Sequence, residues 1–233
     1  MIDTIFFDVD GTLYDETHAK ITAELQVAEH VAVQTDMDFN IIYNVYHTAK
    51  WEVINGDGKN PNRNNRTKWY EVMLENLHIQ KIEAKILSGK YWGIVKKNIN
   101  PYYDVALVLP ILSKQYNLCV ITDELLEICE EKLEILSLRN YFYEVISSTH
   151  VGSVKPHREL FEYALKRVNT TADKAIMVGD NPARDILGGN RAGLKTAWIK
   201  RGRYFYYPLG ETEVPDIVIS NFVNFPRQIE EVM

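Results

Sequence analysis

Six short, continuously apolar segments alternate with helical patterns along most of the chain, and this alternation limits the folds that the chain can adopt. Amphipathic runs, with apolar residues three and four positions apart, lie between most of these segments. Strands that are apolar throughout and are joined by helices form parallel sheets with both faces covered. The sequence therefore predicts an α/β protein with a doubly wound parallel sheet. The predicted strands are IFFDV near residue 5 and residues 118–122, 143–147, 174–180, 195–199 and 216–220.

Residues 16–100 break this alternation, because they carry helical patterns and no convincing strand. The polar segment in the middle of this interval is typical of a loop. Since the block directly follows the first strand, we predict that residues 16–100 form an inserted all-helical domain. Residues 1–15 and 101–233 would then form the core domain. The helical patterns within the insert cover residues 21–33, 39–54, 67–77 and 84–97.

The composition argues against several kinds of partner. A formal net charge of −6 at pH 7 disfavours binding to nucleic acid through the overall field of the protein. No apolar run approaches the roughly 20 residues that a membrane span needs, and the first residues do not follow the pattern of a signal peptide. Two cysteines are too few for a disulfide scaffold in a chain of 233 residues. We therefore expect a cytoplasmic protein with no membrane or nucleic-acid partner.

Polar residues follow the predicted strands directly. The first strand ends in Asp8 and Asp10, the second in Thr122, and the fourth is followed by Asp180 and Asp185. Ligands of parallel sheets bind beyond the carboxyl ends of the strands. Side chains two apart on a strand point to the same side, so Asp8 and Asp10 are expected to be neighbours. Two such anions at a buried strand end are costly without a cation, a shared proton or strong donors.

Lys155 supplies a positive charge that can partly offset these anions. It follows the third predicted strand, in the segment VGSVKP, and precedes a predicted helix. A divalent cation and an ammonium group can together neutralise a cluster of carboxylates. The strand ends therefore predict a metal-dependent site that brings carboxylates, a hydroxyl and an amine together.

These motifs resemble those of a known family. The segments DVDGT, VITD, the lysine of VKP and GDNPARD, in this order, are similar to the four motifs of the haloacid dehalogenase (HAD) superfamily of hydrolases. The resemblance covers the whole chain and implies a Rossmann-like core, with residues 16–100 as a cap that selects the substrate. In detail the chain looks like the phosphatases of that superfamily. The resemblance thus implies that a small phosphorylated metabolite is hydrolysed by a monomer or homodimer.

The resemblance also assigns roles to single residues. Asp8 would attack phosphorus as the nucleophile and form an aspartyl phosphate. Asp10 would protonate the departing alkoxide and later take a proton from the attacking water. Lys155 would neutralise charge on the phosphate, and Thr122 would donate a hydrogen bond to the transferring group. The substrate would be a sugar phosphate, a phosphoglycolate-like acid or a nucleotide.

The implied metal is Mg²⁺, because a dianionic phosphate and a carboxylate nucleophile repel each other. Mg²⁺ binds oxygen ligands and often takes one or two carboxylates together with phosphate and water. The expected ligands are Asp8, Asp180 and the backbone carbonyl of Asp10. Asp185 would be a further ligand or a residue that orients the others.

Three alternatives remain open from the sequence. A phosphomutase of the same superfamily would use the same aspartyl phosphate but exclude water. A non-hydrolytic phospho-acceptor or regulatory module would also join an acidic cluster to a threonine and a lysine, although such a module needs neither the insertion nor Asp10. A haloacid dehalogenase is disfavoured, because that reaction does not need the acid at Asp10.

Some features have no assigned role. Glu124 lies where relatives commonly have glycine, and it would add negative charge near the phosphate. The aromatic run over residues 204–207 is expected to cover the core or form a subunit contact. A basic stretch in the polar loop of the insert is expected to be solvated rather than to bind substrate, and it consists of Lys59, Arg63, Arg66 and Lys68. Aromatic residues of the insert are expected to form its core rather than a pocket, and they are Trp51, Trp69, Tyr70 and Trp92.

Overall fold

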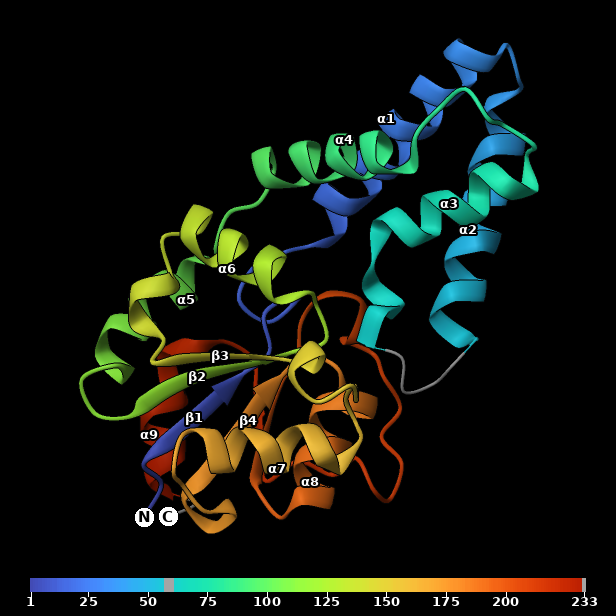
Figure 1. Cartoon of the computed structure of the whole chain (residues 1–233). Coiled ribbons are helices and arrows are strands. Elements are labelled where there is room, and N and C mark those ends of the chain that lie inside the picture. The colour runs from blue at the N-terminus through green and yellow to red at the C-terminus, as the bar shows by residue number, and fades with distance from the viewer. Residues whose placement is uncertain (57–60, 232–233) are drawn as a thin grey trace. The chain divides into compact units, whose positions relative to one another are not determined.

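The structure is a computed structural model that describes residues 1–56 and 61–231 (Figure 1). The chain divides into two compact units. The first unit takes in Met1–Asp15 and the chain from Asn100 onward, and the second unit is Glu16–Ile99. The second boundary lies one residue before the position expected from the sequence.

The first unit is built on a six-stranded sheet in which every pair of neighbouring strands is parallel. The order across the sheet is β3-β2-β1-β4-β5-β6, so the chain winds outward from β1 on one side and then on the other. This order confirms the predicted doubly wound α/β fold. Ligands of such sheets bind where the winding reverses, which here lies beside the carboxyl end of β1. The strands are β1 (Thr4–Phe7), β2 (Asn117–Thr122), β3 (Glu144–Ser147), β4 (Ala175–Gly179), β5 (Lys195–Ile199) and β6 (Ile217–Ile219).

Both faces of this sheet are covered. Phe6 and Phe7 are adjacent in β1 and point to opposite faces, because side chains alternate along a strand. Phe6 is buried in a cluster with Phe161, whereas the ring of Phe7 lies 6.0 and 5.9 Å from those of Phe142 and Phe222. The helices of this unit are α5 (Tyr103–Leu112), α6 (Leu126–Ile135), α7 (Arg158–Arg167), α8 (Leu187–Ala192) and α9 (Phe225–Glu231) (Figure 1).

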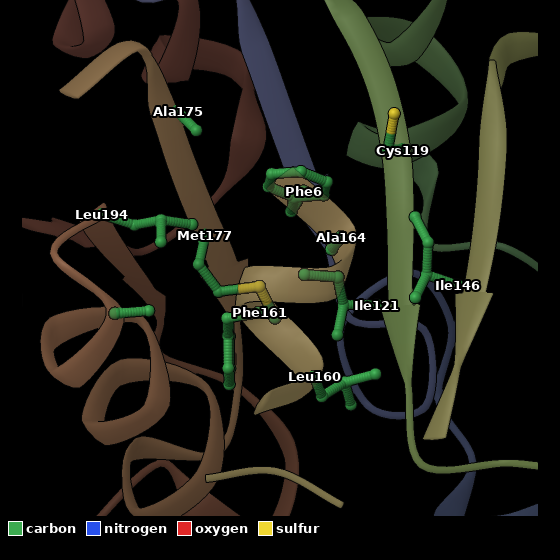
Figure 2. Close-up of a cluster of buried hydrophobic side chains, with 11 residues drawn as sticks. Phe6, Cys119, Ile121, Ile146, Leu160, Phe161, Ala164, Ala175, Met177 and Leu194 are labelled. Carbon is green, nitrogen blue, oxygen red and sulfur yellow. The ribbon is translucent and has the colours of Figure 1, made fainter. Parts of the chain in front are cut away.

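The cluster around Phe161 joins α7 to the strands. Figure 2 shows Leu160 and Phe161 of α7 lying among Ile121 of β2 and Met177 of β4. Full burial of an apolar side chain of this size contributes about 1.5–3 kcal/mol. Helix α8 approaches the cluster at Gly188, where a Cβ would lie only 2.3 Å from the ring of Phe161. The absence of a side chain at Gly188 therefore permits the close packing of α7 and α8.

The second unit is helical and consists, within the described residues, of α1 (Thr17–Thr35), α2 (Phe39–Asn55), the short helix η1 (Pro61–Asn64), α3 (Arg66–Asn76) and α4 (Ala84–Lys97). The side chains of Asp38 and Asn65 accept hydrogen bonds from the first N–H groups of α2 and α3, as N-caps do. Buried residues recur four apart in α1, at Ala19, Ala23, Val27 and Val31. Apolar residues at this spacing form one face of a helix. No helix in the described part of the chain has the length and apolar character needed to cross a bilayer.

The residues of the basic stretch in this unit differ in their burial. Arg66 is buried, which contradicts the expectation that the whole stretch is an exposed polar loop. Its guanidinium lies 4.3 Å from the ring centroid of Trp69 and 4.8 Å from that of Trp92. It also donates a hydrogen bond to the carbonyl of Asn64 at 2.5 Å. Aromatic faces and a carbonyl thus replace water around this cation.

Lys68 and three of the aromatic residues match the expectations from the sequence, whereas Trp51 contradicts them. Lys68 is exposed and pairs with Glu71 at 3.0 Å. Trp69, Tyr70 and Trp92 are buried in the core of the unit as expected, whereas Trp51 is 66% exposed and contributes little to that core. Lys59 lies outside the described residues.

The packing at Gly188 gives the first prediction. Replacement Gly188→Ala is expected to lower the free energy of unfolding by about 1–3 kcal/mol, because the buried ring of Phe161 must move. Urea denaturation measures this. Gly93→Ala in α4 is the control, since a Cβ there meets nothing within 4 Å. That variant should gain up to about 1 kcal/mol from helix propensity. Equal effects of the two substitutions would contradict this account of the packing.

Candidate active site

The chain turns sharply after β1, and this turn brings acidic residues together. Asp8 continues the hydrogen bonding of the strand, since its N–H donates to the carbonyl of Val178 at 2.9 Å. At Gly11 the backbone has a φ of +82°, which L side chains rarely adopt. A Cβ at Gly11 would lie 2.5 Å from Oδ2 of Asp180. Glycine therefore lets the turn approach the acidic residue that follows β4.

Thr12 links the two strand ends. Its Oγ1 lies 3.3 Å from both Oδ2 of Asp8 and Oδ1 of Asp180, and it accepts the N–H of Asp180 at 3.0 Å. The indole N–H of Trp198 donates to the carbonyl of Asp180 at 3.0 Å. Asp180 is thus fixed from two sides. Neither Thr12 nor Trp198 has a role that the sequence alone predicts.

Lys155 lies at the centre of the acidic cluster. Its side chain is 3% exposed. The ammonium donates to Oδ1 of Asp8 at 2.5 Å, to Oδ1 of Asp185 at 2.7 Å and to the carbonyl of Ile121 at 3.2 Å. These contacts match the three N–H groups of a lysine. The structure therefore brings together three of the residues singled out from the sequence, although Asp8 and Lys155 lie 147 positions apart in the chain.

The segment that carries Lys155 is itself anchored. The backbone N–H of Lys155 donates to Oδ1 of Asp123 at 2.8 Å, and Arg184 donates to Oδ2 of Asp123 at 3.2 Å. Asp123 is buried, so its carboxylate exchanges water for these donors. The contact of Arg184 with Asp123 is not predicted from the sequence, because an arginine at the start of a helix usually points into solvent.

Burial and charge perturb the ionisable groups of this cluster. Burial raises the pKa of Asp8 to about 7; the ammonium of Lys155 opposes this rise, while Asp185 and Asp10 add to it. Burial alone would lower the pKa of Lys155, but the carboxylates of Asp185, Asp8 and Asp123 outweigh it and raise that pKa above its ordinary value. The carboxylates around Lys155 therefore carry more negative charge than its one ammonium can neutralise.

The negative charge that Lys155 does not neutralise fits a divalent cation. Asp8, Asp180 and Asp185 are all buried, and each offers a carboxylate oxygen within 4.8 Å of the others. A set of carboxylate oxygens is the donor set that Mg²⁺ prefers. Both oxygens of Asp185 already accept hydrogen bonds, from Lys155 and from the N–H of Asn181 at 3.0 Å. The three carboxylates thus fit a Mg²⁺ ion.

The side chain of Asp10 has different partners from that of Asp8. The ammonium of Lys132 donates to its Oδ1 at 2.8 Å and to its Oδ2 at 3.0 Å. The hydroxyl of Tyr14 also donates to its Oδ1. The role of Lys132 is not predicted from the sequence, where this residue is only part of an amphipathic run. A signal was present, because Lys132 lies three residues after the buried Cys129 on the inward face of α6.

The remaining predicted residues lie nearby. Thr122 is buried at the end of β2, and its Oγ1 accepts the N–H of Glu124 at 3.0 Å. Glu124 is itself buried and faces Lys132, with 3.3 Å between its Oε2 and the ammonium. In the aromatic run over residues 204–207, Tyr206 is 89% exposed and Phe205 is 42% exposed. These two rings therefore do not cover the core within this chain.

Comparisons with known proteins agree with the motifs. A family model described as haloacid dehalogenase-like hydrolase matches residues 5–199. The relatives include a glyceraldehyde 3-phosphate phosphatase of Methanopyrus kandleri, 29% identical over 100% of this chain and 97% of the relative. A ribulose-1,5-bisphosphate 5-phosphatase of Halopiger xanaduensis is 29% identical over 84% of each chain. The structure of the HAD-hydrolase YfnB from Bacillus subtilis, bound to magnesium, has a TM-score of 0.76 and 21% identity, covering 98% of this chain and 99% of that chain.

The central position of Lys155 gives the second prediction. Lys155→Met is expected to lower the free energy of unfolding by about 3–5 kcal/mol at pH 8 in EDTA, because buried carboxylates lose their counter-charge. Urea denaturation measures this. Lys166→Met, on the exposed side of α7, is the matched control and should change stability by less than about 0.5 kcal/mol. If both variants were equally stable, the ammonium would not be what balances the cluster.

Proposed function

Because this chain belongs to the family of haloacid dehalogenase-like hydrolases, we propose that it is a Mg²⁺-dependent phosphatase that acts on a small phosphorylated metabolite through an aspartyl phosphate. One observation carries the proposal. Asp8 follows the central strand β1, its carboxylate contacts the buried ammonium of Lys155, and the carboxylates of Asp180 and Asp185 lie beside it. A nucleophile, a cation and a set of oxygen ligands are thus present at one sheet edge.

The first step assigned to this chain is nucleophilic attack. A carboxylate oxygen of Asp8 forms a bond to phosphorus, and the bond from phosphorus to the ester oxygen breaks. The result is an aspartyl phosphate and an alcohol. Water then attacks the same phosphorus and releases inorganic phosphate, which returns Asp8 to its carboxylate form.

Lys155 and Thr122 would stabilise the negative charge of the transferring phosphoryl group. Lys155 contacts Asp8 directly, so its ammonium lies where negative charge on the transferring phosphoryl group must be balanced. Thr122 adds a hydroxyl at the end of the adjacent strand β2. Because these groups are buried and fixed before substrate arrives, little reorganisation is needed during the reaction.

Mg²⁺, when bound, would supply positive charge between the phosphate and the nucleophile and so reduce their repulsion. Asp8 and Asp180 would hold the ion together with the backbone carbonyl of Asp10. Asp185 would orient Lys155, whose ammonium donates to its Oδ1 at 2.7 Å, and would add negative charge to the ion site. Burial raises the pKa of Asp8, so its ionised form is costly when no cation is bound. A bound cation would favour that ionised form, and the raised pKa therefore supports this arrangement.

Asp10 is assigned the proton transfers. It would give a proton to the ester oxygen as that oxygen leaves, and take a proton from the attacking water in the second step. Its side chain is 21% exposed, unlike the nearly inaccessible Lys132 that holds it. Part of the Asp10 side chain is therefore accessible, although Lys132 contacts both of its carboxylate oxygens.

The substrate is expected to be a small phosphate monoester. The relatives are named for glyceraldehyde 3-phosphate and for ribulose-1,5-bisphosphate, both of which are phosphorylated sugars or sugar-like compounds. The helical unit, residues 16–99, would provide the contacts that select among such compounds. Sugar phosphates, phosphoglycolate-like acids and nucleotides therefore form the panel to be tested.

Phosphate release from this panel, with Mg²⁺ and with EDTA, tests the proposed function. Release is expected to require the metal, and Asp8→Asn is expected to lower kcat by at least about 10³-fold without changing the circular dichroism spectrum. Absence of release from a folded protein that binds Mg²⁺ would contradict a phosphatase and favour a phosphomutase or a phospho-acceptor. Substantial activity of Asp8→Asn would remove Asp8 as the nucleophile.

The role of Asp10 gives a separate prediction. Asp10→Asn is expected to lower kcat for alkyl phosphates by about 10²- to 10⁴-fold, because an alkoxide leaves poorly without a proton. The loss should be much smaller for p-nitrophenyl phosphate, whose leaving group is stable as an anion. Steady-state kinetics on both esters measure the difference. Equal losses on the two substrates would count against Asp10 as the acid.

A further inference from the structure

Lys132 is the most unusual buried cation of the first unit outside the cluster around Asp8. Its side chain is 1% exposed, although lysines are rarely buried completely. The three N–H groups of its ammonium match three acceptors: Oδ1 and Oδ2 of Asp10, at 2.8 and 3.0 Å, and Oε2 of Glu124 at 3.3 Å. A buried ion pair of this kind is commonly no more stable than apolar packing of the same volume. Its presence therefore calls for a reason other than stability.

Glu124 is a fixed anchor for this lysine. Its Oε1 accepts the N–H of Leu125 at 3.1 Å, and its Oε2 faces the ammonium. Its backbone is held as well, because its N–H donates to Thr122 and its carbonyl accepts the hydroxyl of Ser147 at 2.6 Å. Glu124 thus has few ways to move, and it restricts Lys132 in turn.

Asp10 is the second carboxylate that Lys132 contacts. The ammonium contacts both carboxylate oxygens, and the hydroxyl of Tyr14 donates to one of them. Two donors from different elements fix the rotation of the carboxyl group about its bond to Cβ. An acid that serves a leaving oxygen must point at it within hydrogen-bond reach, so this rotation matters for proton transfer.

We propose that Lys132, held by Glu124, is a positioning residue that fixes the direction of the Asp10 carboxyl group for proton transfer to the leaving oxygen. This inference rests on the proposed function, since it assumes that Asp10 is the acid. It also gives Glu124 a role: its negative charge, which the sequence alone places near the phosphate, is directed to Lys132.

Lys132→Met tests the inference, because methionine fills a similar volume without donors. The readout is steady-state hydrolysis of p-nitrophenyl phosphate and of the alkyl phosphate that the wild-type protein hydrolyses fastest in the panel. We expect kcat for the alkyl phosphate to fall by about 10- to 10²-fold, with a fall of less than about threefold for p-nitrophenyl phosphate. KM should stay within about threefold for both, since the side chain of Lys132 is 1% exposed and its ammonium contacts Asp10 and Glu124. Lys132→Arg, which keeps the charge and the donors, should recover part of the lost kcat.

Two further variants separate positioning from folding. Lys132→Met removes the ion pair of Lys132 with the buried carboxylate of Glu124. The double variant Lys132→Met with Glu124→Gln removes the charge of that carboxylate as well and should show the same dependence on the leaving group. Leu133→Ala truncates a fully buried neighbour on the same helix α6. It should lower the melting temperature, yet it should affect both substrates equally at temperatures where the protein is folded.

The outcomes distinguish this inference from the proposed function. Equal losses on both substrates in the Lys132 variants, or no loss at all, would overturn the positioning role even if Asp10→Asn shows the expected difference. A difference between substrates in Leu133→Ala would also overturn it, because general loosening of α6 would then explain the effect. If the wild-type protein releases no phosphate, or if Asp10→Asn shows no difference, the proposed function or the role of Asp10 fails and the inference fails with it.

Discussion

Two buried lysines balance the charge of the carboxylates that follow the strands of the first unit. Lys155 is shared by Asp8 and Asp185, and Lys132 is shared by Asp10 and Glu124. Isolated ionised groups at such depth would be very costly, so each lysine must sit between its partners. The strand ends, the segment before α7 and the inward face of α6 are tied together by these two cations.

Backbone geometry makes this charge balance possible. A parallel sheet places the carboxyl ends of β1, β2 and β4 side by side, and so it collects residues that are far apart in the chain. The turn at Gly11 then brings Thr12 against Asp180, and the indole N–H of Trp198 fixes the carbonyl of the same residue. Hydrogen bonds therefore define the position of each carboxylate before any ligand is present.

The features that follow from local pattern could be predicted from the sequence. Continuous apolar runs identify parallel strands, and the order of strands and helices places Asp8, Asp180 and Lys155 at one edge. Lys132 and Arg66 could not be predicted in the same way, because cations in helices or polar loops are usually solvated. Their burial depends on partners brought by tertiary structure: carboxylates for Lys132, and aromatic rings for Arg66.

Two carboxylates that lie two residues apart on one strand end can perform different chemistry only if their surroundings differ. Asp8 lies deeper and faces Lys155, in the group of carboxylates that fits a cation. Asp10 turns toward Lys132 and Tyr14 and keeps part of its side chain accessible. In the proposed reaction each lysine would therefore do more than cancel charge, because it would keep Asp8 for the ion and phosphorus and Asp10 for the leaving group. Glu124 holds the same lysine from the other side, with 3.3 Å between its Oε2 and the ammonium.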